Sequence, residues 1–342
     1  MIDTTALHPP GPSGAGIFFD TADSKSRAVS AAASLTPRRH LLGLEGLPAE
    51  HLHELLEAAR RWRVRWSLSR VPGDALAGVE VCNAFFEDST RTRLSFELAQ
   101  RRLGATPLSF SIAGSSCSKG ESLLDTLRTI AALGIDVLVM RHSASGAALC
   151  ASRELGVSVV NAGDGAHEHP TQGLLDLLTL SDAWAGEFEG KRLAIVGDVA
   201  HSRVARSACF GLTTLGASVT VAGPATLMPH DVEALGCGVA PSVEDALRDA
   251  DAAIVLRLQT ERMEQGLLPS LAEYAQAWGV TTARAELMKP HAVLLHPGPM
   301  NRGVEIASDV ADAERSRVLV QVENGVAVRA AVLAWCAGRD VA

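Results

Sequence analysis

The amino-acid sequence predicts an α/β protein with two domains, each built on a doubly wound parallel sheet, joined by helices. The first observation is length, because 342 residues are long for one domain and ample for two. The second is an alternation of short apolar runs with helical patterns over residues 79–184. The third is that this alternation stops at residues 185–190 and then restarts. Repeated strand–helix units place helices on both faces of a parallel sheet, so two such series predict two sheets.

Composition suggests where the segments begin and end. Residues 1–37 are rich in Ala, Ser, Gly and Pro, and we expect a partly disordered or docking extension there. The first domain is expected to span residues 38–185 and to be completed by a C-terminal helix within residues 324–342. The second domain is expected to span residues 186–323.

The elements of the first domain follow from periodicity. A helix is expected to open at residues 48–50, because an apolar stripe at helical spacing follows, consisting of Leu52, Leu55, Leu56, Ala59 and Trp62. Apolar runs then predict strands at 79–84, 107–112, 136–140 and 157–161. Helices are expected at 94–103, 121–133, 145–155 and 169–184.

The second domain repeats the same pattern. Strands are expected at 192–196, 218–222, 252–256 and 293–295, with helices at 202–215 and 242–249. Residues 257–283 are expected to be irregular, and a final helix is expected from about residue 324 to 337. Ligands of such sheets bind beyond the carboxyl ends of the strands, so polar motifs that follow strands are the candidates for a site.

Charge and cysteine content exclude several classes of protein. A formal net charge of −8 argues against general nucleic-acid binding, which needs a basic surface. The six cysteines are scattered without metal-binding spacing, which is typical of reduced cytoplasmic thiols. No apolar run approaches the roughly 18 residues of a membrane span, and no signal peptide is recognisable. We therefore expect a cytoplasmic protein that binds neither membrane nor nucleic acid.

The most informative stretch is Ser-Thr-Arg-Thr-Arg at residues 89–93, where a strand passes into a helix. Free backbone N–H groups and the positive end of the helix dipole face outward at such a point. Hydroxyl and guanidinium groups add donors suited to a phosphate dianion. The alternative is an N-cap at Ser89 or Thr90 followed by a solvated basic turn. The repeated Thr and Arg residues favour an anion site.

Three further motifs follow predicted strands. His169 opens a helix, so its imidazole could polarise a carbonyl oxygen and the Gln172 amide could hold an –NH₂ group; a helix cap is the alternative. His-Pro-Gly-Pro at residues 296–299 predicts a rigid loop in which carbonyl groups dominate, or else a structural turn. Arg257 and Gln259 could present a fork to a carboxylate, whereas an isolated arginine is more often a surface residue.

Taken in order, these motifs resemble those of the aspartate/ornithine carbamoyltransferase family. The Ser-Thr-Arg-Thr-Arg string is similar to the family's carbamoyl phosphate signature. His-Pro-Thr-Gln at 169–172 and the 296–299 loop resemble the aspartate enzymes, since ornithine enzymes typically carry His-Pro-Cys-Gln and a His-Cys-Leu-Pro type sequence. The resemblance covers about residue 38 to the C-terminus. It implies transfer of the carbamoyl group from carbamoyl phosphate to L-aspartate, which gives N-carbamoyl-L-aspartate and phosphate for pyrimidine synthesis.

The same resemblance implies a set of site residues. Those implied for carbamoyl phosphate are Ser89, Thr90, Arg91, Thr92, Ser116, Arg141, His169, Gln172, Pro297 and Gly298. Those implied for aspartate are Lys119, Arg203, Arg257, Gln259, Gly298 and Pro299. Catalysis is implied for Arg91, Thr92, Lys119, Arg141 and His169. Glu87 is implied to join the two domains through Arg203 and Arg262, and the bond before Pro299 is implied to be cis.

Partners are also implied by the resemblance. The family pattern implies a homotrimer with shared active sites, in which the loop of residues 116–121 closes over a neighbouring subunit's site. Some bacterial members with N-terminal extensions associate with dihydroorotase or a dihydroorotase-like chain, so residues 1–37 are expected to serve assembly or regulation. Neither a cofactor nor a metal is implied. Two alternatives stay open, namely a carbamoyltransferase with a different amine acceptor and a non-catalytic homologue that acts as a scaffold or regulatory partner.

Overall fold

The computed structural model describes residues 39–69, 71–111, 120–258 and 266–339. These residues belong to one compact unit. The extension predicted for residues 1–37 lies outside the described residues, so its expected role stays a prediction.

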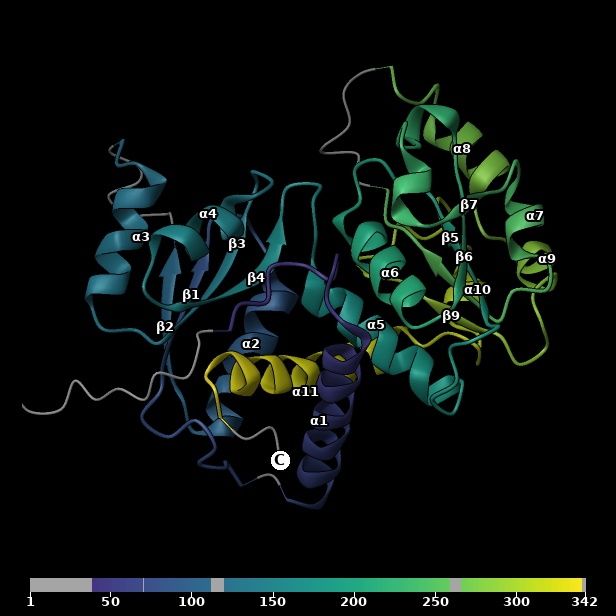
Figure 1. The fold of residues 1–342 in the computed structure, drawn as a ribbon. Helices are drawn as coiled ribbons and strands as arrows, with labels where there is room; N and C mark the ends of the chain where they lie inside the picture. Colours follow the sequence, from purple (N-terminus) through teal and green to yellow (C-terminus); the bar gives the residue numbers. More distant parts are fainter. Residues whose placement is uncertain (1–38, 70, 112–119, 259–265, 340–342) are drawn as a thin grey trace, which may run out of the picture. The chain divides into compact units, whose positions relative to one another are not determined.

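The first sheet has four parallel strands in the order β2-β1-β3-β4. Its strands are β1 Glu80–Phe85, β2 Thr106–Ser111, β3 Val137–His142 and β4 Ser158–Asp164. The helices that alternate with them are α2 Thr90–Leu103, α3 Leu123–Ala132 and α4 Ala147–Glu154 (Figure 1).

Alternate residues of these strands pack into two different clusters. Val81 and Phe85 of β1 belong to a large core cluster that includes residues of α2 and α5. Cys82 and Ala84, between them in sequence, belong to a second cluster with residues of α3 and α4. Because side chains of a strand alternate between faces, both faces of this sheet are covered by helices. The predicted doubly wound arrangement is therefore confirmed for this sheet.

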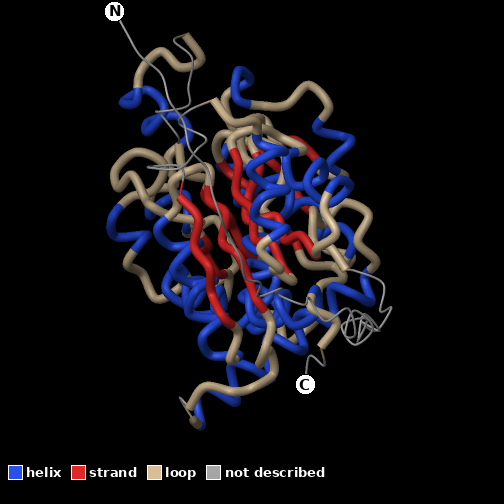
Figure 2. Tube along the Cα trace, turned by 90° about the vertical axis from the view of Figure 1, so that its left-hand side faces the viewer, coloured by secondary structure: helices blue, strands red, loops and turns tan. Residues whose placement is uncertain are grey.

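The second sheet has five parallel strands in the order β7-β6-β5-β8-β9. They are β5 Arg192–Val196, β6 Ser218–Ala222, β7 Gly238–Val239, β8 Ala252–Val255 and β9 Val293–Leu295. The accompanying helices are α6 Arg203–Thr214, α7 Val243–Leu247, α8 Leu271–Trp278, α9 Thr282–Ala285 and α10 Ser308–Ala311, with short 3₁₀ turns η2 Ala225–Leu227 and η3 Val232–Leu235. Figure 2 shows the strands enclosed by helices.

Three further helices complete the core. They are α1 Ala49–Leu68, α5 Pro170–Ala183 and α11 Val318–Cys336. Helix α11 contacts α1, α2 and α5, and it also contacts β9 of the second sheet. By length and composition α11 could cross a membrane, contrary to our expectation that no run was long enough. Because 67% of its apolar window is buried inside the fold, we interpret α11 as a core helix.

Two predicted boundaries and one predicted loop were wrong. Helix α11 begins at Val318, six residues before the predicted start, and α2 begins at Thr90, four residues before. Residues 257–283, expected to be irregular, contain α8 and the start of α9. The sequence does contain a signal for the start of α8, the Ser-x-x-Glu pattern at residues 270–273. In the structure the Ser270 hydroxyl caps α8 by accepting the backbone N–H of Glu273.

Candidate active site

One cavity of about 550 Å³ collects most of the predicted site residues. Its lining follows strands of both sheets, beyond their carboxyl ends, as expected for parallel sheets. The predicted residues that line it are Ser89, Thr90, Arg91, Thr92, Arg141, His169, Gln172, Arg203, Arg257, Pro297, Gly298 and Pro299. Four predicted residues, Ser116, Lys119, Gln259 and Arg262, lie outside the described residues, so their assignments stay predictions.

The predicted anion motif forms the first turn of α2. Ser89 occupies the N-cap position, but its side chain makes no capping hydrogen bond, so the simple cap interpretation is not supported. The first N–H groups of a helix have no partner within the helix, which leaves them available to a ligand. Arg91 lies against Gly298, where an added Cβ would stand 3.3 Å from the Arg91 Cζ. The motif and the 296–299 loop therefore share one wall of the cavity.

Two cations face the same space from different sheets. Arg91 follows β1 of the first sheet, and Arg257 follows β8 of the second. Burial and, after it, the charge of Arg257 lower the pKa of Arg91. Guanidinium groups that repel each other in this way favour an anionic ligand between them. The cavity is thus suited to negative charge, although the chain as a whole is acidic.

Glu87 joins two largely buried arginines. Its Oε2 lies 2.8 Å from an Arg203 terminal nitrogen and 3.2 Å from the Arg141 Nε. Burial, then the charges of Arg203 and Arg91, lowers the pKa of Arg141 to about 9. Burial also lowers the pKa of Arg203 to about 10. The predicted pairing of Glu87 with Arg203 is present, and Arg141 of β3 is a second partner that the sequence did not suggest.

His169 is buried and neutral. It follows β4 at the N-cap position of α5, yet its side chain makes no capping hydrogen bond. Its backbone N–H donates to the Ser207 hydroxyl at 2.9 Å, and its Nδ1 has no hydrogen-bond partner among the described residues. Burial, then the charges of Arg141, Arg203 and Arg329, holds the pKa of His169 well below its usual value. A neutral imidazole can donate one N–H without carrying a charge itself.

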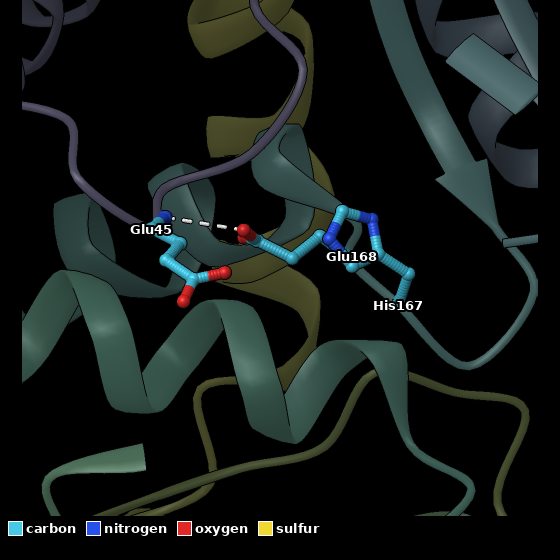
Figure 3. A group of neighbouring side chains, drawn as sticks. All are labelled: Glu45, His167 and Glu168. Carbon is cyan, nitrogen blue, oxygen red and sulfur yellow. Dashed lines mark hydrogen bonds between the residues drawn. The ribbon is translucent and has the colours of Figure 1, made fainter. Parts of the chain in front are cut away.

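Glu168, the residue before His169, holds this part of the chain in place. Figure 3 shows it beside Glu45 and His167, and one ligand atom of each lies within 4.8 Å of the others, a grouping that could hold a cation. The buried Glu168 carboxylate already accepts the N–H groups of Leu44 at 2.7 Å and Glu45 at 3.1 Å. It also accepts the Ser207 hydroxyl at 2.8 Å. Because the Glu168 carboxylate already accepts three hydrogen bonds, we interpret it as a structural residue that fixes the position of this segment.

The 296–299 loop is held by its own first residue. The His296 Nδ1 accepts the N–H of Gly298 at 2.8 Å, and its Nε2 lies 3.2 Å from Glu305. Gly298 has a positive φ of 61°, a conformation that glycine adopts without strain. The peptide bond before Pro299 is cis, as the resemblance implied.

Three further residues were missed by the sequence reasoning. Gln321 and Arg329 of α11 line the cavity, and Asp176 of α5 lies behind it. Arg329 is 4% exposed, its guanidinium stands 5.2 Å from the ring centre of Phe96, and burial lowers its pKa to about 9. A single arginine within the apolar run of residues 326–335 was an available signal, because a buried charge needs a specific environment.

Comparison with known proteins gives two family matches that together cover most of the chain. Residues 39–182 match the model described as "Aspartate/ornithine carbamoyltransferase, carbamoyl-P binding domain". Residues 189–336 match the corresponding "Asp/Orn binding domain". The "Aspartate carbamoyltransferase catalytic subunit" of Pelotomaculum thermopropionicum is 51% identical over 297 residues, covering 86% of this chain and 95% of the relative. The relative of the same name from Gemmatimonas aurantiaca is 52% identical over 302 residues, covering 88% and 94%.

Solved structures show the same similarity. Aspartate transcarbamoylase from Trypanosoma cruzi, in complex with carbamoyl phosphate and aspartate, has a TM-score of 0.78 and 30% identity, covering 86% of this chain and 96% of that one. Ornithine carbamoyltransferase from Pyrococcus furiosus has a TM-score of 0.77 and 28% identity, with the same coverage. The fold therefore does not distinguish aspartate from ornithine enzymes, and only residues in the cavity can determine the acceptor.

The anion motif predicts a test by phosphate binding. Replacement of Arg91 by Ala should weaken binding of inorganic phosphate roughly 10- to 100-fold, because a charged hydrogen bond contributes about 1.5–3 kcal/mol. Arg93→Ala is the matched control, since Arg93 is exposed on the same helix turn and does not line the cavity. Calorimetric titration with phosphate measures both. Equal affinities for the two variants would show that the motif is a solvated turn.

Proposed function

The chain belongs to the aspartate/ornithine carbamoyltransferase family, and we propose that it transfers the carbamoyl group of carbamoyl phosphate to the amine of L-aspartate. The products are N-carbamoyl-L-aspartate and phosphate, which places the reaction in pyrimidine synthesis. The observation that carries this proposal is one cavity that holds an anion motif, a neutral imidazole and two arginines suited to carboxylates. Two relatives at 51% and 52% identity are named aspartate carbamoyltransferase catalytic subunits, which supports aspartate as the acceptor.

The phosphate end of the donor fits the first turn of α2. Ser89, Thr90 and Arg91 all line the cavity, where they offer hydroxyl, guanidinium and backbone N–H donors to a phosphate. The departing phosphate is basic enough to take the proton that the amine loses, so the chain need not supply a separate base. On the strength of the resemblance we keep Ser116 as a further carbamoyl phosphate ligand and Lys119 as a catalytic and aspartate-binding residue.

The carbonyl end fits three donors at the back of the cavity. Attack by the amine converts the carbonyl into a tetrahedral oxyanion, which Thr92, Arg141 and His169 would stabilise. His169 can donate to that oxygen throughout the neutral pH range, because its pKa is held low by burial and neighbouring cations. One well-placed donor of this kind lowers the barrier by roughly 3–4 kcal/mol.

The part of the cavity proposed for the amine acceptor contains two arginines, Arg203 and Arg257. We assign Arg203 to the α-carboxylate and Arg257 to the side-chain carboxylate of aspartate, with Gln259 kept from the resemblance. The cationic side chain of ornithine would be repelled by both arginines. A non-catalytic homologue would be expected to lack such groups, whereas Arg91, Arg141, His169 and Arg257 all line the cavity. A different amine acceptor therefore stays the stronger alternative.

We propose a homotrimer with shared active sites for the assembly. Leu94 and Leu98, one helical turn apart on α2, are both exposed, which gives an apolar strip suited to contact with a second copy of the chain. A larger assembly with dihydroorotase or a dihydroorotase-like chain through residues 1–37 is proposed from the resemblance. We propose a cytoplasmic location from the scattered spacing of the cysteines, and the five cysteines among the described residues are free.

Acceptor choice tests the proposed function through Arg257. The unmodified protein should release phosphate from carbamoyl phosphate with aspartate and far more slowly with ornithine. Arg257→Ala should lower kcat/KM for aspartate roughly 10- to 100-fold, as expected for loss of a charged hydrogen bond, and leave the KM for carbamoyl phosphate nearly unchanged. Arg248→Ala serves as the control, because Arg248 is exposed and outside the cavity. Phosphate release with ornithine but not with aspartate would contradict aspartate as the acceptor. An equal loss of affinity for carbamoyl phosphate in Arg257→Ala would contradict the assignment of Arg257 to aspartate.

Subunit mixing tests the shared site. If Lys119 serves a neighbouring chain and His169 serves its own, the variants Lys119→Ala and His169→Ala should each be nearly inactive alone. After dissociation and random reassociation, about a quarter of the sites in a cyclic trimer should combine an intact Lys119 with an intact His169. Phosphate release assays on the mixture measure this. Verified subunit exchange without any recovery would place both residues in one chain's site.

A further inference from the structure

A buried carboxylate lies directly behind the part of the cavity wall that Gln172 and Gln321 form. Asp176 is 1% exposed and stands one helical turn after Gln172 on α5. The Gln172 Nε2 donates to its Oδ1 at 2.9 Å, and the Gln321 Nε2 of α11 donates to the same oxygen at 2.7 Å. Both glutamines line the cavity, whereas Asp176 does not.

This arrangement determines which way the two amides face. An ionised carboxylate only accepts hydrogen bonds, while an amide has a donating –NH₂ end and an accepting oxygen. With both –NH₂ ends turned to Asp176, both oxygens must face elsewhere. The Gln321 oxygen accepts the backbone N–H of His296 at 3.0 Å, which fixes the start of the 296–299 loop.

The oxygen of Gln172 is left for the ligand. Among the described residues nothing donates to Gln172 Oε1, and this atom is absent from the buried unpaired polar atoms, so it is open to the cavity. An accepting oxygen at this place matches the –NH₂ of a carbamoyl group. It has nothing to accept from the methyl group of acetyl phosphate, which is otherwise similar in shape and charge.

We propose that Asp176 is a positioning residue that fixes the Gln172 amide, so that the site selects an acyl phosphate bearing an –NH₂ group over one bearing a methyl group. The proposal rests on the proposed function, because it names a determinant of donor choice at that same site. Asp176 acts through Gln172 and does not itself reach the donor.

The ionised Asp176 destabilises the fold, which argues against a purely structural role. Burial raises its pKa to about 7, an effect that the hydrogen bonds from Gln321 and Gln172 and the charge of Arg329 oppose. A carboxyl group whose pKa is raised in the folded state destabilises the fold as pH rises from about 4 through 7. A neutral residue of the same shape would avoid this loss at pH 8, but it could donate as well as accept and would no longer determine the amide orientation.

Asp176→Asn tests the proposal. At pH 8 the variant should have a kcat/KM for carbamoyl phosphate at least about tenfold lower, whereas the inhibition constants of acetyl phosphate and inorganic phosphate should stay within about twofold. Its midpoint of thermal unfolding should be equal to or above that of the unmodified protein. Asp182→Asn is the matched control on the same helix, because Asp182 pairs with Arg60 and Arg63 at the surface and should change none of these values.

The outcomes separate the possibilities. Equal weakening of carbamoyl phosphate, acetyl phosphate and inorganic phosphate would assign Asp176 a structural role and overturn the proposal. If the variant does not fold, the affinities of the unmodified protein for carbamoyl phosphate and acetyl phosphate are compared. Binding of carbamoyl phosphate about tenfold more tightly supports the selection, and equal binding overturns it. Calorimetric titration gives these affinities without turnover. Failure of carbamoyl transfer to aspartate would therefore count against the proposed function and leave the selection measurable.

Discussion

The site depends on one carboxylate, Glu87, which holds two largely buried arginines supplied by different sheets. Arg141 lies at the end of β3 in the first sheet, and Arg203 opens α6 beside the second. A buried cation without a partner is costly, because its desolvation is not offset by an opposite charge. Glu87 therefore stabilises both arginines and at the same time sets the distance between the groups proposed for the two substrates. The positive cavity is a local arrangement within a chain of net charge −8.

The same concentration of cations explains how His169 acts. A histidine near the surface would be partly protonated at neutral pH, but burial and three arginines keep this one neutral. It can then polarise a carbonyl oxygen without adding another charge to a crowded cavity. In the proposed reaction the proton lost by the amine leaves with phosphate, so the protein would supply donors and orientation, and not a base. Arg329 of α11, buried against Phe96 of α2, contributes to this field from the wall of the cavity.

Much of the fold and the outline of the site could be predicted, because the carboxyl ends of parallel strands converge and the motifs follow strands. Arg91, His169 and Arg257 lie far apart in sequence, yet strand order brings them to one cavity. Asp176 and Gln321 could not be predicted, since they lie inside helices and their role depends on how α5 packs against α11. The α2 start was misplaced because the Thr and Arg residues of the motif carry no apolar periodicity, although they form its first turn.

Glu87 connects the two halves of the site through its ion pairs with Arg141 and Arg203. A change to Gln removes the charge of this side chain and keeps its shape. Glu87→Gln should lower the free energy of unfolding by about 3–5 kcal/mol, as expected when a buried pair loses one partner. It should also lower kcat/KM for aspartate, whereas Glu154→Gln, which removes a surface partner of Arg128, should change neither. Chemical denaturation with steady-state assays of both variants gives the answer. A Glu87→Gln protein with unchanged stability and unchanged kcat/KM for aspartate would contradict this account.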